Sequence, residues 1–147
     1  MVEATVSGEG FRLVLRVWGY ERPHLDSGAD ANWLMGEAEL TADLGGAYRA
    51  KQSLTPRTEE IEAFRDELVR LLDALDGEAT LGHMEEQVGC SVTLRRGKGE
   101  FSGFVRQSYG PELRVNGLPT DQSYLRESLT GFEKLAAAFP VKGDPLG

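Results

Sequence analysis

The sequence predicts an α+β fold of antiparallel strands, with about six to seven strands and two amphipathic helices packed on one side of the sheet or sheets. Two observations support this class. Runs of alternating apolar and polar residues, typical of half-buried strands, precede a segment with apolar residues at helical spacing. The same order then occurs a second time within the 147 residues. We therefore expect strands, a helix, further strands and a closing helix.

The first half predicts three strands, at residues 11–18, 33–42 and 47–54, each with alternating apolar residues. A polar loop at residues 19–30 separates the first two strands, and its length is typical of loops that carry function. The turn signal Leu44-Gly45-Gly46 precedes the third strand. Short connections favour an antiparallel arrangement of these strands.

A change of period after the third strand predicts the first helix. Pro56 suits a first helical turn, with Thr55 or alternatively Thr58 as the cap, and Gly77 should end the helix. A second helix is predicted to begin at a cap formed by Thr120 or Asp121 and to run through residue 138, because Pro140 prevents its continuation. The predicted apolar stripe of the first helix is Ile61, Phe64, Leu68, Leu71, Leu72 and Leu75; that of the second is Tyr124, Leu125, Leu129, Phe132, Leu135, Ala136 and Phe139.

Strands between the helices are predicted at residues 79–82, 88–95, 100–109 and 112–115. A hairpin turn lies at residues 96–99. Gly103 interrupts the third of these strands, which indicates a bulge or a close approach of another backbone. The expected organisation is one domain over residues 1–140, followed by a frayed tail at 141–147.

Composition limits the classes of partner. The net charge is −8, and residues 55–86 hold ten acidic and three basic residues, a net −7. An acidic chain argues against direct binding of nucleic acid and suits a basic protein partner, although the acids could simply solvate a helix face. No apolar run approaches the roughly 18 residues of a membrane span, and no signal peptide is evident. Cytoplasmic localisation without membrane association is therefore expected.

No catalytic or metal-binding pattern stands out. His24, Asp26 and Asp30 share the long loop, but their spacing matches no metal motif, and the surroundings of His83 lack the second histidine of zinc proteases. The single cysteine, Cys90, is in phase with apolar strand residues and is predicted to be buried. We therefore expect no enzyme, no metal site and no cofactor.

Two tryptophans bracket the long loop, and each falls on the strand face opposite the better apolar set. Trp18 shares its face with arginines, whereas Trp33 shares its face with acids. Aromatic residues beside charges on an exposed sheet face are typical interface anchors, although a second small core is the alternative. The candidate partner-binding residues are Trp18, Trp33, Glu37, Glu39, Glu59, Glu60, Glu62 and Glu67.

The strand at 13–18 followed by Gly19-Tyr20-Glu21-Arg22-Pro23, and then Asp30-Ala31-Asn32-Trp33-Leu34, resembles the WapI-like immunity proteins of bacterial polymorphic toxin systems. Those proteins share a Gly-Tyr-Glu-x-Pro turn, an Asp-x-Asn-Trp-Leu strand start and a closing helix that ends near Phe-Pro. Here that ending reads Ala138-Phe139-Pro140-Val141.

The resemblance implies binding rather than catalysis. Such proteins remain in the producing cell and neutralise a sibling toxin domain, in the founding examples a tRNA-cleaving one. The implied partner is a toxin domain with a basic surface, which the acidic chain would complement. The alternative is a small-ligand or regulatory binding domain that uses the loop region 19–30. Neither reading predicts the oligomeric state.

Overall fold

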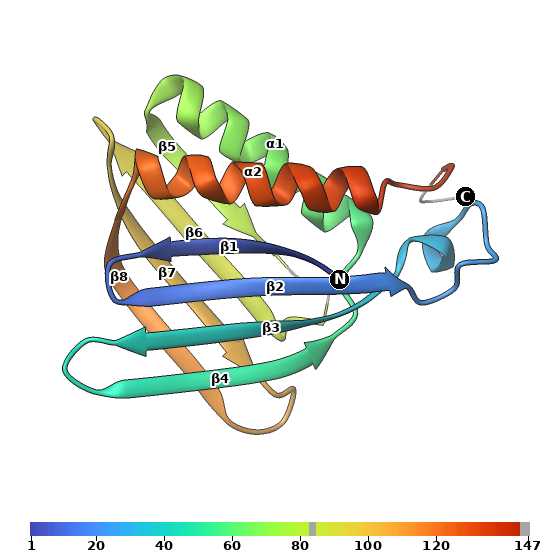
Figure 1. Ribbon diagram of the computed structural model, residues 1–147, viewed down its shortest axis with the longest axis horizontal. Coiled ribbons are helices and arrows are strands. Elements are labelled where there is room, and N and C mark those ends of the chain that lie inside the picture. Colours follow the sequence, from blue (N-terminus) through green and yellow to red (C-terminus); the bar gives the residue numbers. More distant parts are fainter. Residues whose placement is uncertain (83–84, 145–147) are drawn as a thin grey trace.

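The computed structural model describes residues 1–82 and 85–144. This part of the chain forms four strands and a helix, and then repeats that order (Figure 1). The strands and α-helices are β1 (Val2–Gly8), β2 (Phe11–Tyr20), β3 (Leu34–Asp43), β4 (Ala47–Leu54), α1 (Thr58–Ala74), β5 (Asp76–Leu81), β6 (Val88–Arg95), β7 (Lys98–Arg106), β8 (Glu112–Asp121) and α2 (Gln122–Ala138); a short 3-10 helix, η1 (Ala29–Asn32), lies in the loop before β3. The predicted order of strands, helix, strands and helix is confirmed.

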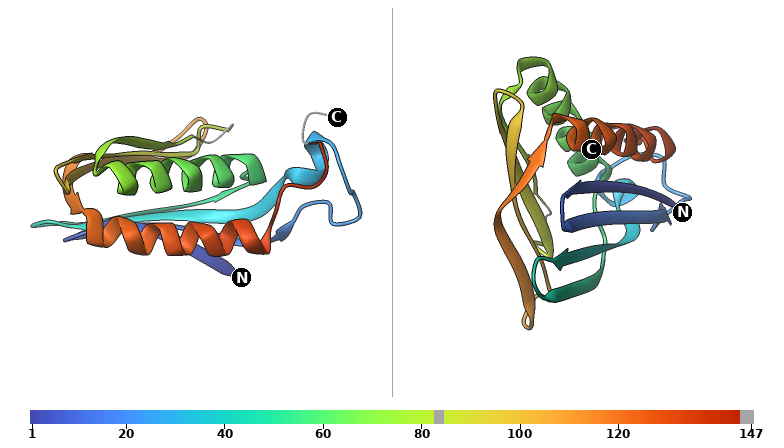
Figure 2. Two further views of the ribbon diagram at one scale, coloured as in Figure 1. Left: turned by 90° about the horizontal axis from the view of Figure 1, so that it is seen from above. Right: turned by 60° about the vertical axis from the view of Figure 1, so that its left-hand side comes forward.

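The strands form two antiparallel sheets of four, in the orders β1-β2-β3-β4 and β5-β6-β7-β8. Strands of the second sheet run obliquely behind those of the first (Figure 1). Helix α2 lies along β1, α1 lies along β5, and the two helices pack side by side on one side of the sheets (Figure 2). The predicted α+β class is confirmed, with eight strands among the described residues instead of about six to seven.

Both sheets turn their apolar faces inward, so that one core forms between the sheets and the helices. Phe11 on β2 stacks on Phe101 on β7, with ring centroids 4.6 Å apart, and this contact joins the two sheets. Gly8 allows β1 to approach β8, because a Cβ atom there would lie 2.2 Å from the carbonyl oxygen of Pro119.

The helix ends differ in part from the sequence prediction. Helix α1 begins at Thr58 with Arg57 as its cap, so the predicted cap at Thr55 and the alternative at Thr58 are both wrong. The backbone N–H of Arg57 donates to Glu60 Oε1 at 3.0 Å. Leu75, in the left-handed conformation (φ 55°), ends α1 before Gly77, which belongs to β5. The cap of α2 is Asp121, as predicted, and its carboxylate accepts from two backbone N–H groups.

The largest differences from the predicted strands concern β1 and β8, while β5 begins at Asp76 instead of residue 79 and β7 at Lys98 instead of residue 100. Strand β1 was not predicted, although Val2, Ala4 and Val6 alternate with polar residues along it and face the core. Strand β8 continues six residues beyond the predicted end at Val115, through Gly117 and Pro119, which an edge strand tolerates. At Gly103 the register shifts, and a Cβ atom would lie 2.9 Å from the carbonyl oxygen of Gly89. The predicted bulge or close approach at Gly103 is therefore confirmed.

None of the helices in the described part of the chain is long and apolar enough to cross a membrane.

Candidate protein-binding surfaces

The outer face of the first sheet carries ion pairs that cross all four strands. Alternation along each strand places charged side chains on this face, and the register sets acids beside bases. We call this set the ion-pair chain, and its members are Glu3, Arg16, Glu37, Glu39, Arg49 and Lys51. Three acids and three bases give it no net charge.

Glu37 and Glu39, two candidate partner-binding residues, lie within the ion-pair chain. Arg16 Nη1 is 3.0 Å from Glu39 and 3.6 Å from Glu37, while Lys51 Nζ is 3.3 Å from Glu37. The two acidic side chains are only 15% and 13% exposed. The hydrogen bond from Arg49 lowers the pKa of Glu39, and Arg16 lowers it further. A partner would have to displace these contacts to reach either carboxylate.

Trp18 and Met35 form an exposed apolar pair at the end of the same face. Trp18 lies at a register irregularity, between the paired residues Val17 and Gly19, and 47% of it is exposed, against 40% of Met35. Both side chains line a groove of about 520 Å³, together with Ser53, Thr55, Glu85 and Gln87. Exposed large apolar side chains beside polar rims are typical of protein-binding sites.

Trp33 occupies a different environment from Trp18. It precedes β3, is partly buried and does not line the groove. The guanidinium of Arg57 lies 5.1 Å from its ring centroid, a cation–π contact, and Arg57 also pairs with Glu59 at 2.9 Å. The structure therefore separates the two tryptophans: Trp18 is exposed on the outer face of the first sheet, and Trp33 packs against the start of α1.

The candidate acids of α1 have internal contacts of their own. Glu59 pairs with Arg57, and Glu60 accepts from the Arg57 backbone N–H. Glu67 accepts from the backbone N–H of Thr80 at 3.3 Å. Burial of the Tyr20 phenol raises its pKa, and the nearby negative charge of Glu62 raises it further. The acidic stretch thus caps α1 and contacts β5 as well as facing solvent.

Sequence reasoning missed the role of Asn32, a residue of the Asp-x-Asn-Trp-Leu motif. Asn32 is fully buried, and its Nδ2 donates to the carbonyl oxygens of Gly28 (3.0 Å) and Lys142 (3.2 Å). Its Oδ1 accepts from Thr58 Oγ1 (3.0 Å) and from Lys142 N (2.7 Å). One amide therefore joins the loop, the start of α1 and the segment after α2.

Tyr20, from the Gly-Tyr-Glu-x-Pro turn, makes the neighbouring contacts. Its hydroxyl donates to the Pro140 carbonyl at 2.6 Å, its ring meets Phe139 edge-on, and Lys142 Nζ lies 3.9 Å from the ring centroid. Residues 141–144, predicted as a frayed tail, thus lie against the loop, and Gly28 N also donates to Asp144 O. Residues 145–147 lie outside the described part. The sequence carried a signal for this junction between the loop and residues 140–144, because Tyr20, Asn32 and the Phe-Pro ending are all among the residues that resemble the WapI-like family.

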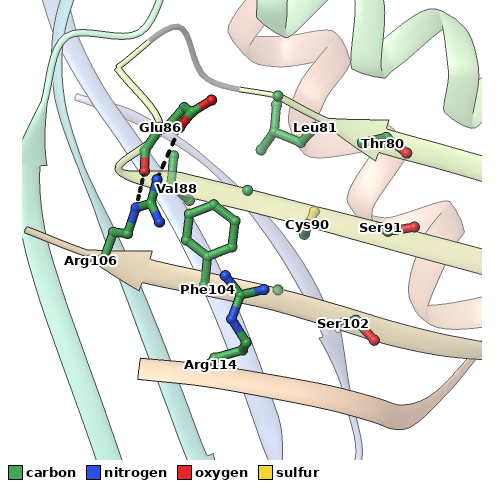
Figure 3. Close-up of a pocket in the computed structure, with 13 residues that line it drawn as sticks. Thr80, Leu81, Glu86, Val88, Cys90, Ser91, Ser102, Phe104, Arg106 and Arg114 are labelled. Atoms are coloured by element: carbon green, nitrogen blue, oxygen red, sulfur yellow. Dashed lines mark hydrogen bonds and ion pairs between the residues drawn. The ribbon is translucent and has the colours of Figure 1, made fainter. Parts of the chain in front are cut away.

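A second hollow, of about 510 Å³, lies on the outer face of the second sheet (Figure 3). The ring of Phe104 lies over Gly89, where a Cβ atom would be 2.8 Å from it. The guanidinium groups of Arg106 and Arg114 lie 5.1 and 4.6 Å from the ring centroid. Both arginines pair with acids, namely Glu86 and Glu112. The hollow is therefore charge-balanced, and neither it nor the Trp18 groove includes a residue of the 19–30 loop.

The described residues contain no group of three or more histidine, cysteine or acidic side chains that could hold a metal ion. His83 lies outside the described residues. Cys90 is buried, as predicted, and burial raises the pKa of its thiol to about 12. The thiol is therefore protonated at neutral pH, which suits a core residue and not a nucleophile.

Comparison with known proteins gives a family and a fold. The sequence profile described as the immunity protein WapI-like family matches residues 5–140. No curated protein matches the chain. Among solved structures, the plant transcriptional regulator PBF-2 is 14% identical with a TM-score of 0.52, covering 95% of this chain and 89% of that one. WHY1 from Arabidopsis thaliana is 16% identical with a TM-score of 0.53, covering 95% and 85%. At these identities the two structures show a shared fold alone.

Proposed function

This chain belongs to the immunity protein WapI-like family, and on that basis we propose that it is a non-enzymatic immunity protein that binds and neutralises a cognate bacterial toxin domain in the cytoplasm of the producing cell. The family match over residues 5–140 carries the proposal. The net charge of −8 suits a basic toxin, such as a nuclease whose cleft binds phosphates.

Two surfaces support a protein-binding role. Trp18 and Met35 supply exposed apolar area with Glu85 at the rim of their groove, and aromatic and methionine side chains are enriched in the centres of interfaces. The acidic stretch of α1 supplies the charge that would draw a basic partner into encounter. In this proposal Trp18 anchors the complex, and the acids of α1 speed its formation.

The deciding experiment is co-expression with the toxin domain encoded beside this gene. Cells that produce the toxin domain alone should stop growing, whereas cells that also produce this protein should grow. Equal death with and without the protein would contradict the proposed function.

We expect Trp18→Ala to weaken toxin binding about tenfold or more, mainly by faster dissociation, because a buried aromatic anchor holds a formed complex. Surface plasmon resonance with the purified toxin domain measures this. Tyr109→Ala is the matched control, because Tyr109 is fully exposed at 101% and lies away from the groove. Equal losses in the two variants would exclude Trp18 as the anchor.

The double variant Glu62→Lys/Asp66→Lys should slow association with the toxin about fivefold at low salt and flatten its salt dependence. These positions leave the cap at Glu60 and the Glu67 contact to β5 intact. Stopped-flow kinetics measures the effect. The control is Glu127→Lys/Glu133→Lys on the exposed face of α2, which changes the net charge equally, from −8 to −4. If both double variants slow association alike, net charge is responsible and α1 is not the steering surface.

A further inference from the structure

The two sheets have four edge strands, and in the described part of the chain three of them are obstructed. Helix α2 covers β1 so closely that a Cβ atom at Gly131 would lie 2.9 Å from Ala4 Cα. Helix α1 covers β5, where Glu67 accepts from the Thr80 backbone N–H. Strand β8 contains Pro119, which cannot donate a ladder hydrogen bond. These are ordinary ways in which proteins prevent strand addition.

The fourth edge, β4, has none of these obstructions. All eight of its residues pair with β3 in an unbroken register. Among the described residues, no backbone hydrogen bond joins Tyr48, Ala50 or Gln52 to anything other than β3. Tyr48 is 59% exposed, and the side chain of Arg49 is 65% exposed. The strand therefore presents a regular and accessible backbone edge.

A groove of about 500 Å³ runs along this edge. One wall is β4, from Tyr48 to Gln52, and the other is the hairpin between β7 and β8. The hairpin contributes apolar surface from Pro111 and Leu113, beside the charged side chains of Arg106 and Glu112, while Val105 at the base of the groove is buried. An extended chain beside β4 would direct alternate side chains into this groove and the others outward, level with the outer face of the first sheet.

The charges on the outer face indicate which chain would fit. Arg49 and Lys51 stand two residues apart at the edge, with side chains 65% and 51% exposed, while their partners Glu39 and Glu37 lie behind them. We propose that β4 is a strand-addition site for an extended segment of another protein, in which acidic residues alternate with apolar ones. Acids would face Arg49 and Lys51, and apolar side chains would enter the groove.

A second copy of this chain does not fit the same edge. Paired strands place residues of the same face opposite each other, so antiparallel pairing of two β4 strands in its central registers sets Arg49 opposite Lys51, or either residue opposite itself. Each arrangement brings like charges together. The site is also separate from the Trp18 groove and the acidic stretch of α1, so its test does not depend on a toxin.

The test uses two acetylated, amidated hexapeptides, one of three valine–glutamate repeats and one of three valine–lysine repeats. On titration of the ¹⁵N-labelled protein we expect amide shift changes confined to β4 and the β7–β8 hairpin, slower hydrogen exchange in β4, and about tenfold weaker binding of the lysine peptide. The variant Arg49→Glu/Lys51→Glu should reverse the preference. The matched variant Arg95→Glu/Arg96→Glu, at exposed positions at the end of β6 and in the turn before β7, should keep the preference for the glutamate peptide.

If the double variant at β4 does not fold, Lys51→Gln is a milder test. This variant should reduce the difference in affinity between the glutamate and lysine peptides. Three results would overturn the proposal: no shift at millimolar glutamate peptide, shifts centred elsewhere, such as the Phe104 hollow, or dimerisation of the free protein through β4 in sedimentation experiments.

Discussion

Replacing Phe132 by alanine should lower the free energy of unfolding by about 3–5 kcal/mol. Phe132 on α2 is 1% exposed and meets Phe64 on α1 edge-on, with ring centroids 4.8 Å apart. The substitution removes this contact and leaves a cavity where the two helices meet above the sheets. Urea denaturation followed by circular dichroism measures the loss.

Two comparisons identify the cause of that loss. Phe132→Leu keeps most of the side-chain volume, so it should lower the free energy of unfolding by less than the alanine variant does. Val69→Ala, on the exposed face of α1, should change stability by about 0.5 kcal/mol or less, since Val69 is 37% exposed. A loss below about 1 kcal/mol for Phe132→Ala would show that the two helices do not share a packed core.

Replacing Asn32 by alanine should cost about 3 kcal/mol, because four hydrogen bonds to a buried side chain are lost and each contributes roughly 0.5–1.5 kcal/mol. Amide hydrogen exchange should also become faster at Lys142 and Gly28. The measurements are chemical denaturation and exchange detected by NMR.

Thr58→Val is the matched control for Asn32, because it removes only one of the four bonds and should cost about 1 kcal/mol. Asp30→Ala breaks only the exposed pair with Arg22 and should have an effect below about 1 kcal/mol. If Asn32→Ala resembled Asp30→Ala, the junction between the loop and residues 140–144 would contribute nothing to stability.

Local sequence patterns predicted the class of the fold and much of its detail. The strands at 47–54 and 88–95 have the predicted bounds, because turn signals flank them and alternation is regular. Strand β1 was missed because its inward face shows a run of only three apolar residues, Val2, Ala4 and Val6. The division into two sheets was also beyond prediction, since a period of two shows which face is buried but not which strands are neighbours.

For a similar reason, the sequence predicted the environment of some candidate site residues and not of others. A face can be assigned from alternation, and Trp18 is exposed as that assignment suggests. Whether a charged residue on that face is free depends on strands that are distant in sequence. Glu37 and Glu39 are paired with residues of β2 and β4, and Trp33 packs under Arg57, the cap of α1. The contacts of Asn32 span 110 residues and could not be read from local spacing.

That span has a consequence for how the molecule is made. A chain emerges from the ribosome N-terminus first, at roughly 5–20 residues per second, so Asn32 is synthesised several seconds before Lys142. The first sheet can pair once β4 has emerged, yet the Asn32 amide finds its last partners only after α2 is complete. The loop therefore takes its final form only after residue 142 has emerged, and a chain cut short before it would lose two of the four hydrogen bonds of the buried Asn32 amide.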